Sequence, residues 1–183
     1  MRIIAGEKGG LHFQPPASMP NTRPTTDLAK EGLFNVLENN LDLPSLKTLD
    51  IFGGTGSISY ELASRGVTDL TSVEKDRHMA DYMKKTSAEL GISLKVHCMD
   101  VFAYIQQCTE KFDLIFADPP YGMPNLDKLP GLIFEHGLLP PEGWLVLEHT
   151  RNIDFKKFSY YRSERNYGST IFSIFINREE LKK

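Results

Sequence analysis

The sequence lacks the features of several protein classes. Its 183 residues include only two cysteines, Cys98 and Cys108, without the paired spacing of a zinc site, which argues against a disulfide-stabilised secreted domain. No apolar run is long enough to cross a membrane. The first residues, Met1-Arg2-Ile3-Ile4, lead directly into charge and glycine instead of a signal peptide. We therefore expect a cytoplasmic protein that has no membrane segment and binds no metal.

An excess of positive charge is also missing, because the formal net charge is −3. The charge is nevertheless uneven. Residues 1–30 carry four basic and two acidic side chains, residues 151–183 carry eight and four, and nine basic against eighteen acidic remain in residues 31–150. The ends are thus +2 and +4 and the middle is −9. This asymmetry indicates that a polyanion contacts the two ends, although an unevenly charged surface without a partner would give the same pattern.

The length favours a single domain over residues 1–183, made of an N-terminal arm (1–25) and a core (26–183). In the arm, residues 2–5 and 11–13 flank a glycine-rich stretch, which predicts a β-hairpin. The arm carries Arg2, Lys8 and Arg23, which could follow a phosphate backbone; alternatively, the arm packs across the core.

Strand-like apolar runs alternate with amphipathic helical segments in the core, which predicts an α/β fold with a mostly parallel sheet and an antiparallel edge. We expect helices at 26–39 (with Leu28, Leu33, Phe34 and Leu37 on the buried side), 57–63, 76–90, 102–107 and 126–135. We expect strands at 46–52, 70–74, 94–98, 112–117 and 143–148, and a closing hairpin of 158–162 and 169–176.

The stretch Asp118-Pro119-Pro120-Tyr121 follows the strand predicted at 112–117. The prolines end the strand, so a carboxylate, free carbonyls and an aromatic ring lie together at the C-terminal end of the strand. Open α/β sheets bind ligands at this edge, where the parallel strands end. Asp118 and the Pro119 carbonyl can each accept an N–H bond from an exocyclic base amine, orienting its lone pair and stabilising the charge that develops on alkylation. Tyr121 can stack on the base. The same four residues also occur in ordinary surface turns.

Gly53-Gly54-Thr55-Gly56 joins the first predicted strand to a helix, which places backbone N–H groups and a helix N-terminus at a ligand site. Ser59 replaces the third glycine of the dinucleotide fingerprint, so a pyrophosphate is not required. Asp50 suits a ligand amine. Glu74 lies twenty positions after Gly54, where an acidic side chain grips ribose hydroxyls, and Asp100, after the third strand, could accept an adenine amine.

In this order the residues resemble S-adenosylmethionine-dependent methyltransferases, and most closely the bacterial RsmD-type enzymes that methylate N2 of a guanine in 16S ribosomal RNA. The resemblance spans nearly the whole chain. It is carried by Arg2-Ile3-Ile4-Ala5-Gly6, Thr22-Arg23-Pro24-Thr25-Thr26-Asp27, Glu31-Gly32-Leu33-Phe34-Asn35, Leu49-Asp50-Ile51-Phe52-Gly53-Gly54-Thr55-Gly56, Ser64-Arg65-Gly66, Asp118-Pro119-Pro120-Tyr121 and Tyr167-Gly168.

The resemblance implies a Rossmann-like class I methyltransferase fold with a seven-stranded, mostly parallel sheet whose last strand is antiparallel. It implies S-adenosyl-L-methionine as cofactor and 16S rRNA or the small ribosomal subunit as partner. We expect the protein to be a monomer. The catalytic residues would be Asp118, Pro119, Pro120 and Tyr121. The cofactor-binding residues would be Asp50, Phe52, Gly53, Gly54, Gly56, Glu74, Lys75, Asp100 and Val101. The residues that contact substrate RNA would be Arg2, Lys8 and Arg23.

Two other functions remain open on the sequence. The Asp-Pro-Pro-Tyr motif serves adenine amines equally well, so a DNA adenine-N6 methyltransferase is one alternative, although 183 residues leave little room for a domain that reads DNA sequence. The other is a non-catalytic nucleic-acid-binding module on the same fold. A complete glycine loop beside an intact motif is hard to reconcile with that second alternative.

Overall fold

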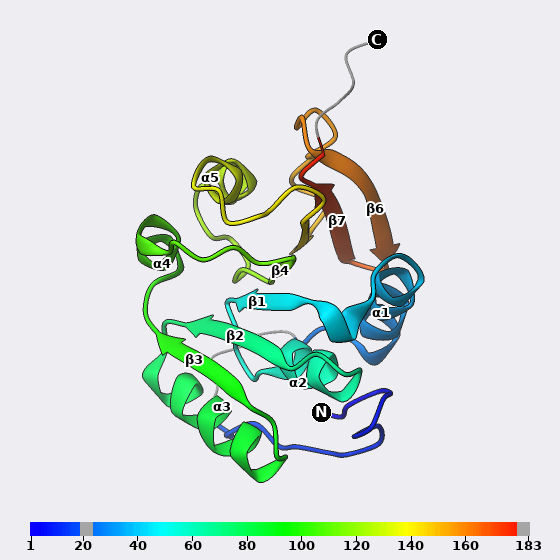
Figure 1. The fold of residues 1–183 in the computed structure, drawn as a ribbon, viewed down its shortest axis with the longest axis vertical. Coiled ribbons are helices and arrows are strands. Elements are labelled where there is room, and N and C mark those ends of the chain that lie inside the picture. The colour runs from blue at the N-terminus through cyan, green and yellow to red at the C-terminus, as the bar shows by residue number, and fades with distance from the viewer. Residues whose placement is uncertain (19–23, 179–183) are drawn as a thin grey trace.

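The computed structural model describes residues 1–18 and 24–178. A seven-stranded sheet in the order β3-β2-β1-β4-β5-β7-β6 forms its centre (Figure 1). The first five strands pair in parallel, and β7 pairs antiparallel with both β5 and β6, as predicted. The strands are β1 (Lys47–Ile51), β2 (Asp69–Glu74), β3 (Leu94–Cys98), β4 (Leu114–Ala117), β5 (Trp144–His149), β6 (Tyr161–Tyr167) and β7 (Thr170–Ile176).

Helices cover both faces of this sheet, because the central strands are apolar on both sides. One face packs against α1 (Asp27–Asn40), α2 (Ser57–Ser64) and α3 (Arg77–Glu89), and the other against α4 (Val101–Gln107) and α5 (Leu129–Glu135). Alternation along β4 divides the core accordingly: Leu114 and Phe116 face the first set of helices, and Ile115 and Ala117 the second. This arrangement is the Rossmann-like α/β architecture that the resemblance implied. No helix in the described ranges is long and apolar enough to cross a membrane.

Most predicted elements are confirmed with small shifts at their ends, but three details were wrong. Leu28 is 71% exposed, because α1 buries Ala29, Lys30, Leu33, Phe34 and Leu37 instead. The helix predicted at 126–135 is divided into a 3₁₀ turn (Leu126–Lys128) and α5, with a proline in the first turn of α5. The sixth strand starts at Tyr161 rather than Phe158 and continues to Tyr167.

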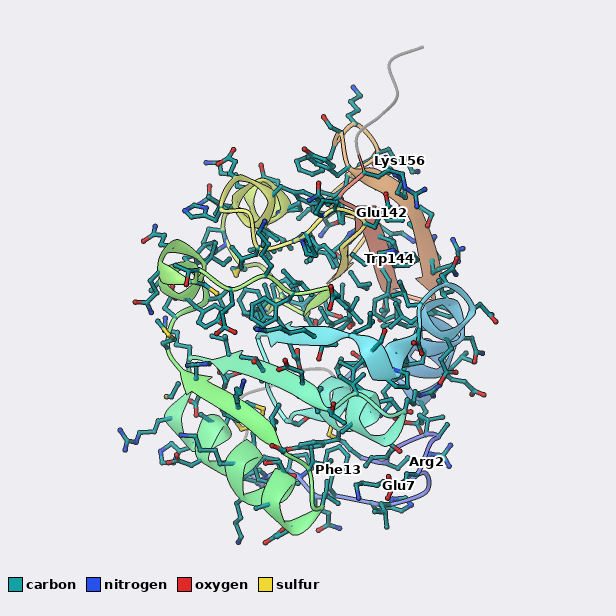
Figure 2. All side chains as sticks on the ribbon, in the orientation of Figure 1. Arg2, Glu7, Phe13, Glu142, Trp144 and Lys156 are labelled. Carbon is teal, nitrogen blue, oxygen red and sulfur yellow. The ribbon has the colours of Figure 1, made fainter. Side chains whose placement is uncertain are left out.

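The N-terminal arm packs against α2 and α1, and its hairpin has a single bridge between Arg2 and His12. Ile3 and Phe13 are buried in the core. Figure 2 shows Arg2, Glu7 and Phe13 at the opposite end of the molecule from Glu142 and Lys156. A polyanion that contacted both Arg2 and Lys156 would therefore have to extend along the molecule.

A buried ion pair anchors the arm. Lys30 on α1 lies 3.6 Å from Glu61 on α2, and both side chains are almost completely buried. Glu61 accepts hydrogen bonds from the backbone N–H groups of Ile4 (2.7 Å) and Ala5 (3.1 Å), and Lys30 donates to the carbonyl of Arg2 (2.7 Å). The arm thus satisfies charges that would otherwise be buried without enough partners.

Candidate active site

Three carboxylates lie at the carboxyl edge of neighbouring strands, on the face covered by α1 and α2. Asp50 belongs to β1, Asp118 directly follows β4, and Glu148 lies near the end of β5. In the parallel register of β4 and β5, Ala117 lies opposite Leu147, so the residues that follow them, Asp118 and Glu148, lie near each other at the end of the two strands. Neighbouring strands are about 4.8 Å apart, and matched side chains leave the same face of a sheet. The three acidic groups therefore gather at one edge.

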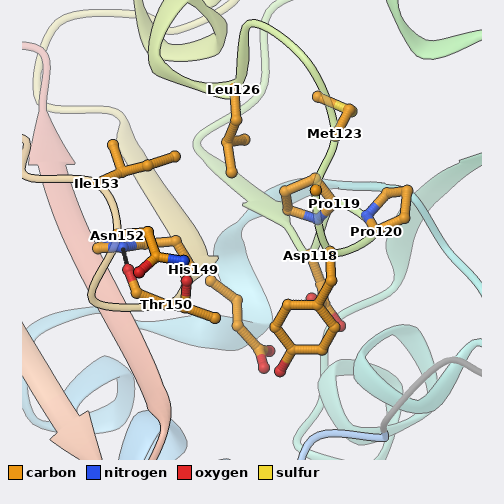
Figure 3. Close-up of a pocket in the computed structure, with 12 residues that line it drawn as sticks. Asp118, Pro119, Pro120, Met123, Leu126, His149, Thr150, Asn152 and Ile153 are labelled. Atoms are coloured by element: carbon orange, nitrogen blue, oxygen red, sulfur yellow. Dashed lines mark hydrogen bonds between the residues drawn. The ribbon is translucent and has the colours of Figure 1, made fainter.

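A cavity of about 110 Å³, which we call the DPPY cavity, opens beside this edge (Figure 3). One wall is the Asp118–Met123 segment and another is the chain that leaves β5, from Glu148 to Ile153. Tyr121, on the rim, is 56% exposed. The cavity thus combines an aromatic ring, acidic side chains and apolar walls, a suitable composition for a flat polar ring such as a nucleobase.

A second cavity of about 80 Å³, the glycine-loop cavity, lies on the other side of Asp118. Its lining includes Asp50, Phe52, Gly53, Gly54 and Asp118, all of which the sequence assigned to ligand binding. Asp118 is shared by both cavities. The structure therefore brings the two sequence motifs together at one carboxylate.

The backbone of the glycine loop is tightly constrained. A Cβ atom on Gly53 would lie 2.2 Å from the Ser72 hydroxyl, so only glycine fits there. Gly54 has a φ of +55° and donates its N–H to Glu74 (2.8 Å), which also accepts from the N–H of Asp76 (2.8 Å). Phe52 itself has a φ of +66°, a strained backbone conformation of the kind that clusters at functional sites.

Asp50 lies beneath the loop in a site that disfavours its charge. Its carboxylate is buried and accepts a hydrogen bond of 2.8 Å from the Ser59 hydroxyl. Burial raises the pKa of Asp50 to about 7, with the Ser59 hydrogen bond acting against the shift and the charge of Glu74 adding to it. A cationic ligand group in the glycine-loop cavity would restore the ionised form, so the site suits an ammonium group.

Asp118 and Glu148 are desolvated together. Burial, followed by the charges of Glu148 and Asp50, raises the pKa of Asp118 well above its usual range. Burial also raises the pKa of Glu148 to about 7, although a hydrogen bond from Thr25 opposes this. Burial and neighbouring negative charges disfavour the ionised forms of these carboxylates. A bound N–H donor stabilises the ionised form, so the carboxylates should bind such donors strongly.

The remaining predicted cofactor-binding residues lie outside the lining of the glycine-loop cavity. Gly56 is the N-cap of α2, Lys75 is exposed after β2, and Val101 is buried in the first turn of α4. Asp100 is exposed and accepts from the backbone N–H groups of Phe102 (2.9 Å) and Ala103 (3.1 Å), which makes it the N-cap of α4. One oxygen of Asp100 is therefore engaged in holding the helix.

The predicted RNA-contacting residues are placed differently from one another. Arg2 is exposed and forms an ion pair with Asp27 (2.7 Å). Lys8 is partly exposed, and its backbone N–H donates to the Ser64 hydroxyl (2.9 Å). Arg23 lies outside the described residues.

The sequence analysis assigned no role to Glu148. The signal was nevertheless present, because Glu148 follows an apolar strand in the same way as Glu74 and Asp118 follow theirs. Only the fold shows that β5 is the neighbour of β4, which brings Glu148 to the wall of the DPPY cavity.

Comparisons with known proteins show which proteins this chain is similar to. A family model described as "conserved hypothetical protein 95" matches residues 1–176. YlbH of Bacillus subtilis, named as a candidate rRNA methyltransferase, is 33% identical over 97% of this chain and all of that protein. "Ribosomal RNA small subunit methyltransferase D" of Escherichia coli is 30% identical over 81% of this chain and 74% of that protein.

A solved structure has the same fold. That of a candidate methyltransferase of Escherichia coli, yhhF, superposes with a TM-score of 0.85 and 23% identity, and the match covers 98% of this chain and 99% of that one.

Proposed function

The chain belongs to the family described as conserved hypothetical protein 95, the RsmD-type family that its motifs resemble, and we propose from this that it methylates ribosomal RNA with S-adenosylmethionine as methyl donor. The finer proposal is that the target is the N2 amine of a guanine in the 16S RNA of the small subunit. The name of the Escherichia coli relative supports small-subunit RNA as the substrate, and the guanine N2 amine rests on the resemblance of the motifs to RsmD-type enzymes. The observation that carries the chemistry is the position of Asp118, which lines both cavities.

The residues in the glycine-loop cavity and at the neighbouring strand ends fit this cofactor. Asp50, a buried carboxylate with a raised pKa, suits the amino group of S-adenosylmethionine. Glu74 already points at the glycine loop through Gly54 and can exchange that bond for ribose hydroxyls. The oxygen of Asp100 that does not cap α4 can accept the adenine amine. The bound cofactor supplies an electrophilic methyl group.

The other residues predicted at this site support the binding surface. Gly53 permits the close approach of the loop to β2, and Gly56 starts α2 in a left-handed conformation. Lys75 and Val101 lie directly after Glu74 and Asp100, so we propose that they flank the ribose and the adenine.

Asp118 and Pro119 orient the amine that receives the methyl group. An exocyclic amine is weakly nucleophilic because its lone pair is delocalised into the ring. Two acceptors, the Asp118 carboxylate and the Pro119 carbonyl, take its two hydrogens and turn its lone pair towards the glycine-loop cavity. The carboxylate also stabilises the positive charge that develops on nitrogen. Pro120 keeps the loop rigid, and Tyr121 stacks on the base, which must be turned out of its RNA helix.

The RNA itself is held by phosphate contacts outside the cavities. We propose that Lys8, Arg23 and Arg2 contribute to these contacts. Because Arg2 is already paired with Asp27, it must exchange this partner for a phosphate. The chain would act in the cytoplasm as a monomeric single domain, with residues 26–183 as the catalytic core and residues 1–25 as an arm.

The test is to incubate the protein with labelled S-adenosylmethionine and small ribosomal subunits from a strain without this modification, then digest the RNA and separate the nucleosides. We expect N2-methylguanosine. A parallel reaction with double-stranded DNA that yields N6-methyladenine, and no product in RNA, would replace the proposal with the DNA enzyme. Cofactor binding without methyl transfer to either nucleic acid would favour the non-catalytic binding module.

A further inference from the structure

Glu148 is the feature of the DPPY cavity that the proposed reaction does not use. It is only 6% exposed, yet it lines the cavity together with Asp118 and the two prolines. Methyl transfer needs the amine to be held by Asp118 and Pro119, and a second buried carboxylate beside them is costly. A buried acidic group that faces a ligand cavity is expected to have a ligand partner.

One oxygen of Glu148 is held by the protein. The Thr25 hydroxyl, just before α1, donates to Glu148 Oε2 at 2.7 Å. Among the hydrogen bonds between described residues, this is the one that the Glu148 carboxylate accepts, and it leaves Oε1 without such a bond. The side chain is therefore fixed at one oxygen, while the other is available to a bound base.

The hydrogen-bonding edge of the base decides which purine such an oxygen accepts. In guanine, N1–H is a donor adjacent to the N2 amine, so the edge offers donors to two acceptors that lie side by side. In adenine, the neighbour of the N6 amine is N1, whose lone pair would face the carboxylate and be repelled. Enzymes that flip bases commonly read this edge by hydrogen bonds.

We propose, on the basis of the proposed function, that Glu148 is a specificity-determining residue that accepts the N1–H of the target guanine while Asp118 and Pro119 hold its N2 amine. Asp118 directly follows Ala117, which pairs with Leu147, the residue before Glu148, and both carboxylates line the DPPY cavity, so they can accept two donors from one edge of a base. The raised pKa values of both groups agree with this assignment, because two N–H donors relieve two desolvated carboxylates. Thr25 acts as a positioning residue for Glu148.

The decisive substrate is an RNA in which the target guanine, once identified, is replaced by 2,6-diaminopurine. This base keeps the N2 amine but presents a lone pair at N1. We expect the wild-type enzyme to methylate it at least about tenfold more slowly than guanine, because a buried carboxylate would then face an acceptor. Equal single-turnover rates on both RNAs would overturn the inference.

The variant Glu148→Gln gives an independent measurement. Its amide oxygen can still accept from Thr25, while its NH₂ presents a donor to the cavity, so the preference should shift towards 2,6-diaminopurine by tenfold or more relative to wild type. Glu142→Gln, the same substitution at an exposed glutamate paired with Arg178, is the matched control and should keep the preference for guanine. An unchanged ratio in a folded Glu148→Gln protein would contradict the inference.

The two proposals fail in different ways. A wild-type enzyme that methylates no guanine in RNA would overturn the proposed function and this inference with it. A wild-type enzyme that methylates guanine without discriminating against 2,6-diaminopurine would overturn the role of Glu148 alone. The wild-type comparison also keeps the inference testable if Glu148→Gln does not fold.

Discussion

Asp118 is the residue on which both cavities depend, and its substitution should impair the chemical step selectively. We expect Asp118→Ala to lower the single-turnover rate by about 10²–10³, the usual effect of removing one preorganised group that stabilises transition-state charge. Asp118→Asn keeps an acceptor without the charge and should give an intermediate rate. Cofactor affinity, measured by calorimetry, should change little. A folded Asp118→Ala protein that binds cofactor and turns over at the wild-type rate would contradict this role.

The buried carboxylates should make the free protein less stable as the pH rises. The pKa values of Asp50 and Glu148 are both raised to about 7, from ordinary values of 3.8 and 4.5. Between about pH 4 and pH 7 the folded state therefore binds more protons than the unfolded state, so this contribution to stability is complete below pH 4 and is lost as the pH rises through 7.

This pH dependence can be measured by thermal unfolding at pH 5.5 and pH 8 without ligands. We expect the Tm to be lower at pH 8 and the difference to be smaller in Glu148→Gln, which removes one of the ionising groups. Glu142→Gln serves as the control, because that side chain is exposed and paired with Arg178 at the surface. A Glu148→Gln protein with the same pH dependence as wild type would show that Glu148 does not titrate as described.

The residues with a motif signature could be found from the sequence, whereas those defined by packing could not. Asp50, Gly54 and Asp118 stand in recognisable spacings at strand ends, and the fold places all three beside the two cavities. Glu148 has no such signature, because its importance depends on which strand lies next to β4. Similarly, the pattern of α1 did not indicate that Lys30 is buried, since its partner Glu61 lies on another helix.

At the scale of elements, strands were predicted well where both faces are apolar, as in β4 and β5. The start of β6 was misplaced because Phe158 and Tyr160 look like strand residues but pack against Phe134 of α5. Strand β6 is largely polar and only half-buried, so its sequence shows little alternation of apolar and polar residues. Its partner β7 was predicted almost to the residue.

Substitution of alanine for glycine should change the free energy of unfolding in opposite directions at two positions, one in the glycine loop and one in α5. Gly53→Ala should lower the free energy of unfolding by about 1–3 kcal/mol, because its new methyl group would overlap the Ser72 hydroxyl and Met83. Gly131, inside α5, has open space around its Cβ position, so Gly131→Ala should raise stability by about 0.5–1 kcal/mol. Chemical denaturation of both variants tests the pair. A neutral Gly53→Ala would mean that the loop can move away from β2.

At the scale of the whole molecule, the N-terminal arm combines structural support with a proposed RNA contact, and the two can be separated. Deleting residues 1–13 should lower the free energy of unfolding by more than about 3 kcal/mol, because Ile3 and Phe13 leave the core and Glu61 loses two backbone donors. The double variant Arg2→Ala/Lys8→Ala should stay close to wild-type stability, since both side chains lie at the surface.

For RNA binding, the double variant is the informative protein. If Arg2 and Lys8 contact phosphates, the slope of log affinity against log salt concentration should decrease in magnitude by up to about 2. Affinity should also fall, while cofactor affinity remains unchanged. An unaltered slope would assign the arm a structural role only.

The sharing of Asp118 by the two cavities has a consequence for inhibition. Two fragments that occupy neighbouring cavities can be joined by a short linker, and the second fragment then binds at the high effective concentration that the linker imposes. A bivalent compound that links an amino-acid sulfide to a purine through the exocyclic nitrogen should therefore bind more tightly than either half alone. Its selectivity over enzymes that bind the same cofactor would come from the purine half, because only that half enters the DPPY cavity, which Asp118 and Glu148 line.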